Sequence, residues 1–284
     1  MEIKHVAVIG GGLMGRQIAL NAAICGYDVK LTDSMPQVLD AVGQWAEEYL
    51  QGRISKGRMT EEQVAATKAR FAVVDSIEAA VSDADLVIEA VIENEEVKKS
   101  VFVEVSRYAP KQAIIGSNSS RMPSSKFIDC VTDPGKLANL HYFNPALVMK
   151  TVEVQVHEQT TEDTIHSLLE FCVNNRKEPV LIRREIEGMI VNRILNAINE
   201  QALYVVENGY ATPEDVDKAC VGGLNHPMGP FRLLDLTGLD LAFQIRDNKY
   251  RATGEKPVGY DLLKSYVEQG RCGRKTKKGF YDYE

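Results

Sequence analysis

The sequence predicts an α/β fold in which a doubly wound sheet domain with an inserted helical hairpin is followed by an all-helical domain. Three observations lead to this fold class. Short apolar runs alternate with helical patterns over the first part of the chain, a polar segment interrupts them between residues 36 and 70, and no convincing strand follows Gly188. Because 284 residues exceed the usual size of one domain, we expect two, at residues 1–187 and 188–284.

The elements of the first domain follow one another in a regular order. Residues 3–9 are rich in β-branched side chains and end at Gly10, whereas residues 13–26 have a helical pattern that Gly26 stops. The remaining predicted strands are 28–32, 71–74, 86–91, 113–116, 137–143, 151–156 and 178–182, with helices at 95–108 and 162–174. Strands that alternate with helices favour parallel pairing, because each crossover helix covers a face of the sheet.

The polar segment from residue 36 to 70 is longer than one crossover helix requires. Gly52 and Gly57 break it, and Thr60-Glu61-Glu62-Gln63 has the N-cap and acidic first turn of a new helix. We therefore expect a helical hairpin inserted into the sheet domain. In the second domain, residues 189–208 are apolar over most of the circumference of a helix, which predicts burial on more than one side.

Composition excludes several classes of function. Lys and Arg number 33 against 40 Asp and Glu, so the net charge is −7 and no global field attracts nucleic acid. The sequence has no apolar run of transmembrane length and no signal-like N-terminus. Its five cysteines are scattered, and neither they nor the histidines have metal-ligand spacing. We expect a cytoplasmic protein with no nucleic-acid partner, no membrane contact and no metal site.

A glycine-rich turn carries the first functional signal. Gly10-Gly11-Gly12-Leu13-Met14-Gly15 follows a predicted strand and opens a predicted helix, which is the context of a dinucleotide-binding turn. Asp33 ends the second strand, 18 residues after Gly15, where a carboxylate accepts hydrogen bonds from the adenosine ribose. A plain glycine connector is the alternative for the turn alone. With Asp33, the pattern predicts NAD as the cofactor, because a carboxylate repels the 2′-phosphate of NADP.

The segment from Gly116 to Glu153 carries the second signal. Ser117-Asn118-Ser119-Ser120 follows a strand and is expected at the carboxyl edge of the sheet, where ligands bind in such folds. His141 stands at a strand end and Glu153 lies 12 residues later on the next strand, an arrangement that can orient a histidine base. Spacing alone leaves a structural histidine and a solvated glutamate equally open.

The chain resembles the 3-hydroxyacyl-CoA dehydrogenase family, and most closely its short monofunctional 3-hydroxybutyryl-CoA dehydrogenases. The resemblance spans nearly the whole chain. Besides the glycine turn, the motifs that carry it are Asp-Leu-Val-Ile-Glu-Ala-Val-Ile-Glu-Asn (85–94), Gly-Ser-Asn-Ser-Ser (116–120), His-Tyr-Phe-Asn-Pro-Ala (141–146), Met-Lys-Thr-Val-Glu-Val (149–154), Val-Asn-Arg (191–193), Pro-Met-Gly-Pro-Phe (227–231) and Gly-Arg-Lys-Thr-Lys-Lys-Gly-Phe-Tyr (273–281).

The resemblance implies an NAD-dependent oxidoreductase that interconverts a short 3-hydroxyacyl-CoA and its 3-oxoacyl-CoA, as in fatty acid or butyrate metabolism. It implies that His141 is the acid/base, that Glu153 orients it, and that Ser120 and Asn192 hold the substrate oxygen. It also places Glu93, Lys98, Ser120 and Asn144 along the ribose and nicotinamide of the cofactor. Without the resemblance, the sequence predicts that Glu93 and Lys98 are an exposed charge pair and that Asn192 is a polar residue in a helix interior.

Two further expectations concern the acyl-CoA substrate and assembly. An acidic chain needs a local basic cluster for the phosphates of CoA, and Arg53, Lys56 and Arg58 form one near the tip of the hairpin, an arm that reaches over CoA in the family. A solvated turn is the alternative for each of these residues. Apolar side chains in residues 189–206 and 231–241 predict a homodimer built on the helical domain, which the family also implies.

The chain departs from the family pattern at three places. Arg121 replaces the usual apolar residue and could alter the acyl pocket, Glu187-Gly188-Met189 replaces Pro-Gly-Phe, and Asn174-Asn175-Arg176-Lys177 is more polar than is typical. Two other functions remain as alternatives. One is a dehydrogenase of a hydroxy acid without CoA, and the other is a non-catalytic NAD-binding structural relative.

Overall fold

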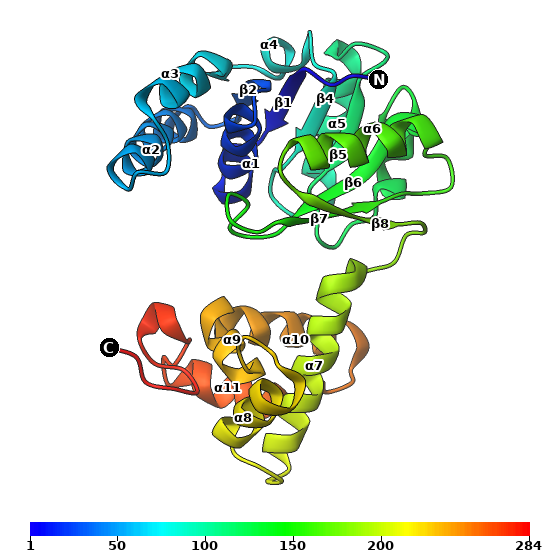
Figure 1. The fold of residues 1–284 in the computed structure, drawn as a ribbon. Helices are drawn as coiled ribbons and strands as arrows, with labels where there is room; N and C mark the ends of the chain where they lie inside the picture. Colours follow the sequence, from blue (N-terminus) through cyan, green and yellow to red (C-terminus); the bar gives the residue numbers. More distant parts are fainter. The chain divides into compact units, whose positions relative to one another are not determined.

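The computed structural model describes residues 1–284, which form two compact units, Met1–Ile190 and Val191–Glu284. The first unit is built on one sheet of eight strands in the order β3-β2-β1-β4-β5-β6-β7-β8 (Figure 1). Its strands are β1 (His5–Ile9), β2 (Asp28–Thr32), β3 (Phe71–Val73), β4 (Leu86–Glu89), β5 (Ile114–Ser117), β6 (Leu137–Tyr142), β7 (Thr151–Gln155) and β8 (Glu178–Ile182). The predicted fold class is confirmed.

Pairing in the sheet is parallel except between β6 and β7, which run antiparallel. Parallel pairing was expected where strands alternate with helices, which is not the case for this pair. The connection from residue 143 to 150 contains no helix and is too short for the crossover that a parallel pair requires. The reversal leaves the carboxyl end of β6 beside the amino end of β7.

Helices cover both faces of the sheet. On one face, α1 (Leu13–Ile24) and α6 (Glu162–Asn174) pack through residues such as Ile18 and Phe171. On the other face, α4 (Ile77–Val81), α5 (Glu95–Tyr108) and the 3-10 helix η1 (Ser124–Cys130) pack through Ala80, Phe102 and Phe127. A second 3-10 turn, η2 (Pro134–Lys136), leads into β6. The core strands β1 and β4 are consequently buried on both sides, as their continuous apolar sequences require.

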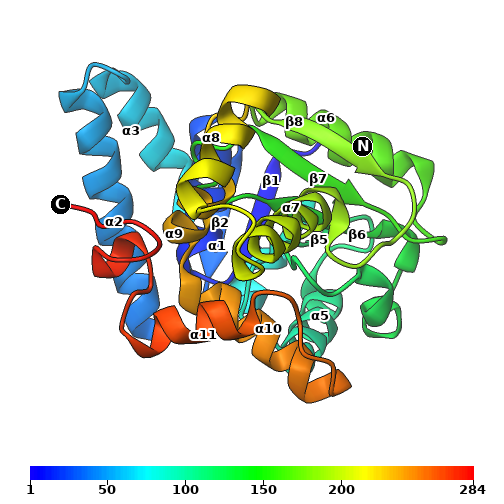
Figure 2. The same cartoon turned by 90° about the horizontal axis from the view of Figure 1, so that it is seen from below.

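The inserted hairpin consists of α2 (Pro36–Ser55) and α3 (Glu61–Arg70), and its prediction is confirmed. Thr60 and Gln63 form a complete capping box at the start of α3, because the side chain of each bonds the backbone N–H of the other. The two helices lie side by side in Figures 1 and 2. Leu50 and Val64 pack with Leu20 of α1, which attaches the hairpin to the helix that follows the glycine turn.

The second unit is entirely helical. Its helices are α7 (Met189–Glu207), α8 (Pro213–Leu224), α9 (Pro230–Thr237), α10 (Leu239–Thr253), α11 (Tyr260–Glu268) and the 3-10 turn η3 (Arg274–Thr276), and α7 begins two residues before the unit does. Leu203, Phe231 and Leu263 lie at the centre of its core. No helix of the structure is both long and apolar enough to span a membrane.

Two buried aspartates bind the C-terminal segment to this helical core. Asp235 accepts hydrogen bonds from the backbone N–H groups of Phe280 and Tyr281 and from the hydroxyl of Tyr283. Asp217 accepts from the backbone of Phe231 and from the hydroxyl of Tyr281. This aspartate clasp explains the glycines of two sequence motifs, because a Cβ on Gly229 would lie 2.3 Å from Asp217 and one on Gly279 would lie 2.0 Å from Asp235.

Candidate active site

Three glycines shape the turn between β1 and α1. A Cβ atom on Gly10, whose φ is +109°, would lie 2.6 Å from the carbonyl oxygen of Ala90, and one on Gly15 would lie 1.8 Å from the carbonyl oxygen of Gly10. At Gly12 a Cβ would meet nothing within 4 Å, and this residue caps α1 without a side-chain hydrogen bond. The N-terminus of α1 is therefore open to an anionic group such as a pyrophosphate.

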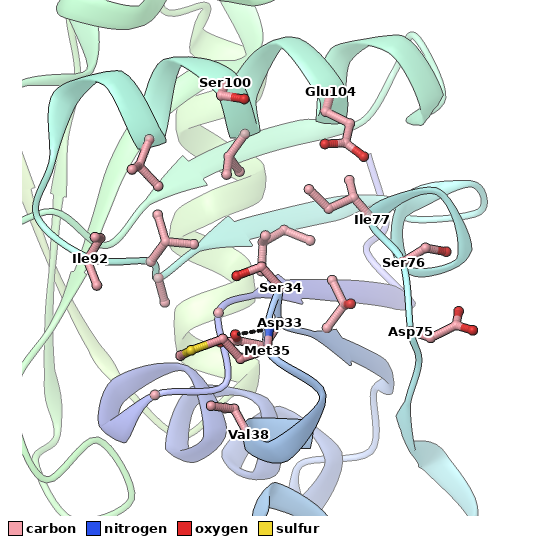
Figure 3. Close-up of a pocket in the computed structure, with 18 of the residues that line it drawn as sticks. Asp33, Ser34, Met35, Val38, Asp75, Ser76, Ile77, Ile92, Ser100 and Glu104 are labelled. Carbon is pink, nitrogen blue, oxygen red and sulfur yellow. Dashed lines mark hydrogen bonds between the residues drawn. The ribbon is translucent and has the colours of Figure 1, made fainter. Parts of the chain in front are cut away.

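Asp33 lies beside this turn at the end of β2. Its Oδ2 accepts a hydrogen bond of 2.7 Å from the N–H of Gly11, and its Oδ1 accepts one of 3.0 Å from the N–H of Met35. The carboxylate also lines the adjoining cavity (Figure 3). Each oxygen has a second lone pair, so the group can still accept hydrogen bonds from a ribose.

The cavity has a volume of about 940 Å³ and extends from the glycine turn past the end of β2 and the residues that follow β4 to α5. Aliphatic side chains form much of its wall, namely Val38, Ile77, Val97 and Val101. These four residues were not predicted from the sequence, although Val97 and Val101 share one face of a predicted helix at i,i+4 spacing. Asp75 and Glu104 add further carboxylates to the lining, so an extra phosphate is unfavourable here. An apolar slot beside an open helix N-terminus fits the adenosine and pyrophosphate of NAD.

Glu93 and Lys98, both predicted to contact the cofactor, belong to a buried charge cluster. Lys98 is fully buried and donates to Glu89 at 2.7 Å, and its Nζ lies 3.1 Å from Glu93. It is therefore not the exposed partner that the sequence alone suggests. Although burial raises the pKa of Glu93, the Ser119 hydroxyl and the Lys98 charge outweigh it and lower the pKa overall. Glu93 stays ionised and partly exposed, as a group that binds ribose hydroxyls must.

Glu89, which was not predicted from the sequence, organises this cluster. Its carboxylate is completely buried at the end of β4 and accepts from Lys98, from the Ser117 hydroxyl at 2.7 Å and from the N–H of Val91 at 2.8 Å. A glutamate at the end of an apolar strand was the only signal in the sequence. By fixing β5 to the start of α5, Glu89 holds the serine segment at the carboxyl edge of the sheet.

Ser120, the predicted substrate contact, is half-buried next to this cluster. Its neighbour Ser119 is the more constrained residue, because its hydroxyl donates to Glu93 at 2.5 Å and accepts from the N–H of Met122 at 2.8 Å. Asn118 accepts from the N–H of Tyr142 at 2.9 Å and so joins the segment to β6. The serine segment therefore lies beside the strand that carries His141.

His141 and Glu153 form a buried pair. They are directly opposed in the antiparallel register of β6 and β7, so their side chains share one face of the sheet. His141 Nδ1 lies 2.9 Å from Glu153 Oε2, and the ring of Phe143 packs against the imidazole with centroids 4.7 Å apart. The other oxygen of Glu153 accepts a 3.0 Å hydrogen bond from the N–H of Ile190 at the start of α7. Nε2 of His141 is left as the ring nitrogen for an external partner.

The remaining predicted residues lie in three places. Asn144 is exposed in the loop after β6, and Leu13 and Met14 are in the first turn of α1. Asn192 is in the first turn of α7, in the helical unit. The structure brings together His141, Glu153 and the serine segment within the sheet unit. It contains no cluster of three or more side chains suited to a metal ion.

The basic residues of the hairpin separate into two groups. Arg53 and Arg58 line a second cavity, of about 190 Å³, together with Arg70 and Arg176. Lys56, which stands between them in the sequence, is exposed and does not line this cavity. The predicted cluster of Arg53, Lys56 and Arg58 therefore does not present its three charges as one group.

A dehydrogenase of this kind needs a site for a nicotinamide nucleotide and an acid/base group at the same edge of the sheet. The chain has both features, and it is an NAD-dependent dehydrogenase by class. Its residues 5–186 match the family profile of the 3-hydroxyacyl-CoA dehydrogenase NAD binding domain, and residues 188–283 match that of the C-terminal domain. The chain belongs to the 3-hydroxyacyl-CoA dehydrogenase family.

Individual relatives agree with this assignment over the full length. The mitochondrial hydroxyacyl-coenzyme A dehydrogenase of Rattus norvegicus is 38% identical, with 99% of this chain and 92% of the relative covered. A 3-hydroxybutyryl-CoA dehydrogenase of Clostridioides difficile is 34% identical, covering 98% of this chain and 99% of its own. The crystal structure of (S)-3-hydroxybutyryl-CoA dehydrogenase from Ralstonia eutropha matches with a TM-score of 0.89 at 29% identity, with both chains fully covered.

Proposed function

We propose that the protein interconverts a short-chain 3-hydroxyacyl-CoA, such as 3-hydroxybutyryl-CoA, and the corresponding 3-oxoacyl-CoA, with His141 as the acid/base. The observation that carries the proposal is the buried 2.9 Å contact between His141 and Glu153. Full-length similarity to enzymes named for the 3-hydroxybutyryl-CoA substrate supports a short acyl group on the substrate. NAD, when bound, supplies the acceptor or donor of the hydride.

The pair suits proton exchange with a substrate hydroxyl. Glu153 accepts from Nδ1–H of His141, which fixes the tautomer whose Nε2 is free to take a proton. In the oxidation direction, Nε2 removes the proton of the 3-hydroxyl while the hydrogen on C3 leaves with its electron pair. The Glu153 carboxylate then stabilises the imidazolium that forms. In the reduction direction, the imidazolium returns the proton to the carbonyl oxygen of the substrate.

Other residues are assigned supporting roles. Ser120 and Asn192 hold the substrate oxygen, Glu93 binds the nicotinamide ribose and Asn144 contacts the nicotinamide. Lys98 acts indirectly, because its ammonium is committed to Glu89 and Glu93. Arg121 is exposed directly after the serine segment and is proposed to alter the acyl pocket.

One assay distinguishes this function from its alternatives. NADH oxidation is compared with acetoacetyl-CoA and with free acetoacetate, in the unmutated enzyme and in His141→Ala. We expect turnover with the CoA ester, and a loss in His141→Ala of about 10²-fold to 10⁴-fold with NADH binding retained. Equal efficiency with free acetoacetate would indicate a non-CoA hydroxy acid. Absence of turnover with either compound would indicate a structural relative.

The hairpin is proposed as the surface for the phosphates of CoA, with Lys56 as its exposed cation. Because Arg58 lines the separate arginine cavity, the two charges are tested singly. Lys56→Glu should raise KM for acetoacetyl-CoA several-fold, with a larger effect at low salt, because ions screen exposed charges. Arg58→Glu serves as the matched charge reversal. An unchanged KM in both variants would place CoA on another surface.

We also propose a homodimer built on the helical unit. The sequence points to residues 189–206 and 231–241, but Phe231, Leu234 and Leu239 are buried in the core of the unit itself. The apolar surface that remains exposed includes Leu236, Leu241 and Leu224, of which the last is 65% accessible. Patches of this kind favour self-association. Light scattering at micromolar protein should give twice the mass of 31.5 kDa, and a monomer mass would refute the proposal.

A further inference from the structure

A set of buried polar side chains lies behind the active site and takes no part in the proposed chemistry. It includes Asn175 and Lys177 of the turn between α6 and β8, which the sequence marks as unusually polar, together with Asn21 of α1 and Tyr142 of β6. All four are less than a tenth exposed. Because buried polar groups are costly unless they are paired, their partners show what the set holds in place.

Lys177 binds the loop that connects β6 to β7. Its side chain is 6% exposed, and Nζ donates to the carbonyl oxygen of Ala146 at 2.6 Å and to that of Met149 at 2.9 Å. It forms no ion pair with a carboxylate. Burial lowers the pKa of Lys177, so the two carbonyl dipoles are what compensates its charge in the fold.

The two carbonyls belong to a tight turn that the backbone closes by itself only in part. The carbonyl oxygen of Pro145 accepts from the N–H groups of Val148 and Met149, both at 2.9 Å. Lys177 adds the only side-chain bonds to the carbonyls of this turn. Asn144 directly precedes this turn and follows His141 by three residues, so the ammonium holds the segment next to Asn144.

Asn175 makes the second connection. Its side-chain amide donates to the hydroxyl of Tyr142 at 3.0 Å, and its Oδ1 accepts from the amide of Asn21 at 2.8 Å. Asn21 lies on α1, the helix that begins at the glycine turn, and Tyr142 is adjacent to His141. The turn between α6 and β8 therefore links the helix at the pyrophosphate site to the strand and loop at the nicotinamide site.

We propose that Lys177 is a positioning residue for the dehydrogenase reaction, which holds the loop of Asn144 so that the nicotinamide ring faces the substrate atom served by His141. Asn175 supports it by fixing Tyr142 against α1. This inference rests on the contact between Asn144 and nicotinamide in the proposed function. The inference predicts that loss of the ammonium lowers the affinity for the nicotinamide half of the cofactor and leaves the affinity for the adenosine half nearly unchanged.

The test compares two ligands that differ only by the nicotinamide. Dissociation constants of NADH and ADP-ribose are measured for the unmutated protein and for Lys177→Met, which keeps most of the length of the side chain and removes the ammonium. We expect NADH to bind about tenfold more weakly, with ADP-ribose affected less than about twofold. With acetoacetyl-CoA, kcat should fall by about 10-fold to 10²-fold. The isotope effect with NADH deuterated at the transferred position should rise, because hydride transfer becomes the slow step.

Arg246→Met is the matched control. Arg246 is another cation held by two backbone carbonyls, those of Val258 at 3.0 Å and Ala242 at 3.1 Å, and it lies in the helical unit. We expect it to lower the melting temperature without changing the ratio of the two dissociation constants. If Lys177→Met does not fold, Tyr142→Phe removes one hydroxyl of the same network and is judged by the same ratio.

An unchanged ratio and isotope effect in a folded Lys177→Met would overturn the inference, and so would an equal change in Arg246→Met. The ratio requires no acyl substrate. Failure of the unmutated enzyme to reduce acetoacetyl-CoA would therefore contradict the proposed function, while the two dissociation constants would still decide the role of Lys177.

Discussion

Replacing Glu153 with glutamine separates two hydrogen bonds of its carboxylate, those with His141 and with Ile190. One oxygen accepts a hydrogen bond from Nδ1 of His141, and the other accepts one from the N–H of Ile190. The carboxylate is fully buried. A glutamine has one oxygen and one NH₂ group, so it can satisfy only one of these donors. If the oxygen stays on Ile190, the NH₂ faces Nδ1 and forces the proton onto Nε2, which is then unable to act as a base.

The introduced glutamine supports catalysis only when its amide oxygen faces Nδ1 of His141, and this orientation is unfavourable. With its oxygen on Nδ1, the NH₂ group opposes the N–H of Ile190, and an unsatisfied buried donor costs about 1 to 3 kcal/mol. At about 1.36 kcal/mol per factor of ten, this lowers the productive fraction by roughly 5-fold to 150-fold. A neutral amide also stabilises the imidazolium about 1 kcal/mol less than a carboxylate does. Together we expect kcat to fall by about 25-fold to 10³-fold.

Steady-state oxidation of NADH by acetoacetyl-CoA measures this effect, with NADH titration and thermal unfolding as checks on folding. The loss should be smaller than in His141→Ala, since the histidine remains. Glu158→Gln is the control, because Glu158 is an exposed glutamate shortly after β7. Full activity in Glu153→Gln would refute the tautomer argument. A loss accompanied by an equal loss in Glu158→Gln would show that the effect is unspecific.

Three further predictions concern the cofactor site and the core. Asp33→Ser should reduce the preference for NADH over NADPH in kcat/KM by at least about tenfold, because it removes the charge that repels the 2′-phosphate; equal efficiencies in the unmutated enzyme would count against this. Gly15→Ala should destabilise the protein by about 1 to 3 kcal/mol in chemical denaturation, because its Cβ would overlap Gly10, whereas Gly43→Ala, with open space around it, should be neutral or stabilising. Burial raises the pKa of Cys172 to about 12, so at about pH 8 iodoacetamide should leave this thiol unmodified in the folded protein, as peptide mass spectrometry would show.

The glycine turn of the cofactor site could be predicted from the sequence because the residues that form it are close together in the chain. Gly15 and Asp33 are required by backbone contacts within one strand-helix-strand unit, and Gly10 by its own φ of +109°, so their spacing reports that unit directly. The same holds for the capping box of Thr60 and Gln63, whose two hydrogen bonds join residues three apart. Such features follow from chain geometry before any distant contact forms.

Features that depend on contacts between distant segments could not be predicted from the sequence. Lys98 reads as an exposed helix residue because its carboxylate partner, Glu89, lies on a buried strand that looks purely structural. The antiparallel pairing of β6 and β7 is marked in the sequence only by the lack of a helix between residues 143 and 151, because an apolar run has no direction of its own. The motifs at 227–231 and 273–281 are easy to see, but their reason is steric, since Asp217 and Asp235 leave no room for a side chain at Gly229 and Gly279.

The aspartate clasp also sets an order of events during synthesis. The sheet unit can complete its core once residue 190 is available, but the helical unit cannot, because Phe280 packs against Phe231 with ring centroids 4.6 Å apart and its N–H bonds to Asp235. Asp235 and Phe280 are separated by 45 positions, which take about 2 to 9 s to translate. During that interval Asp235 lacks the backbone N–H groups of Phe280 and Tyr281, and Phe231 lacks the ring of Phe280. The helical unit therefore cannot complete its core until Phe280 has been added, whereas the core of the sheet unit includes no residue of this segment.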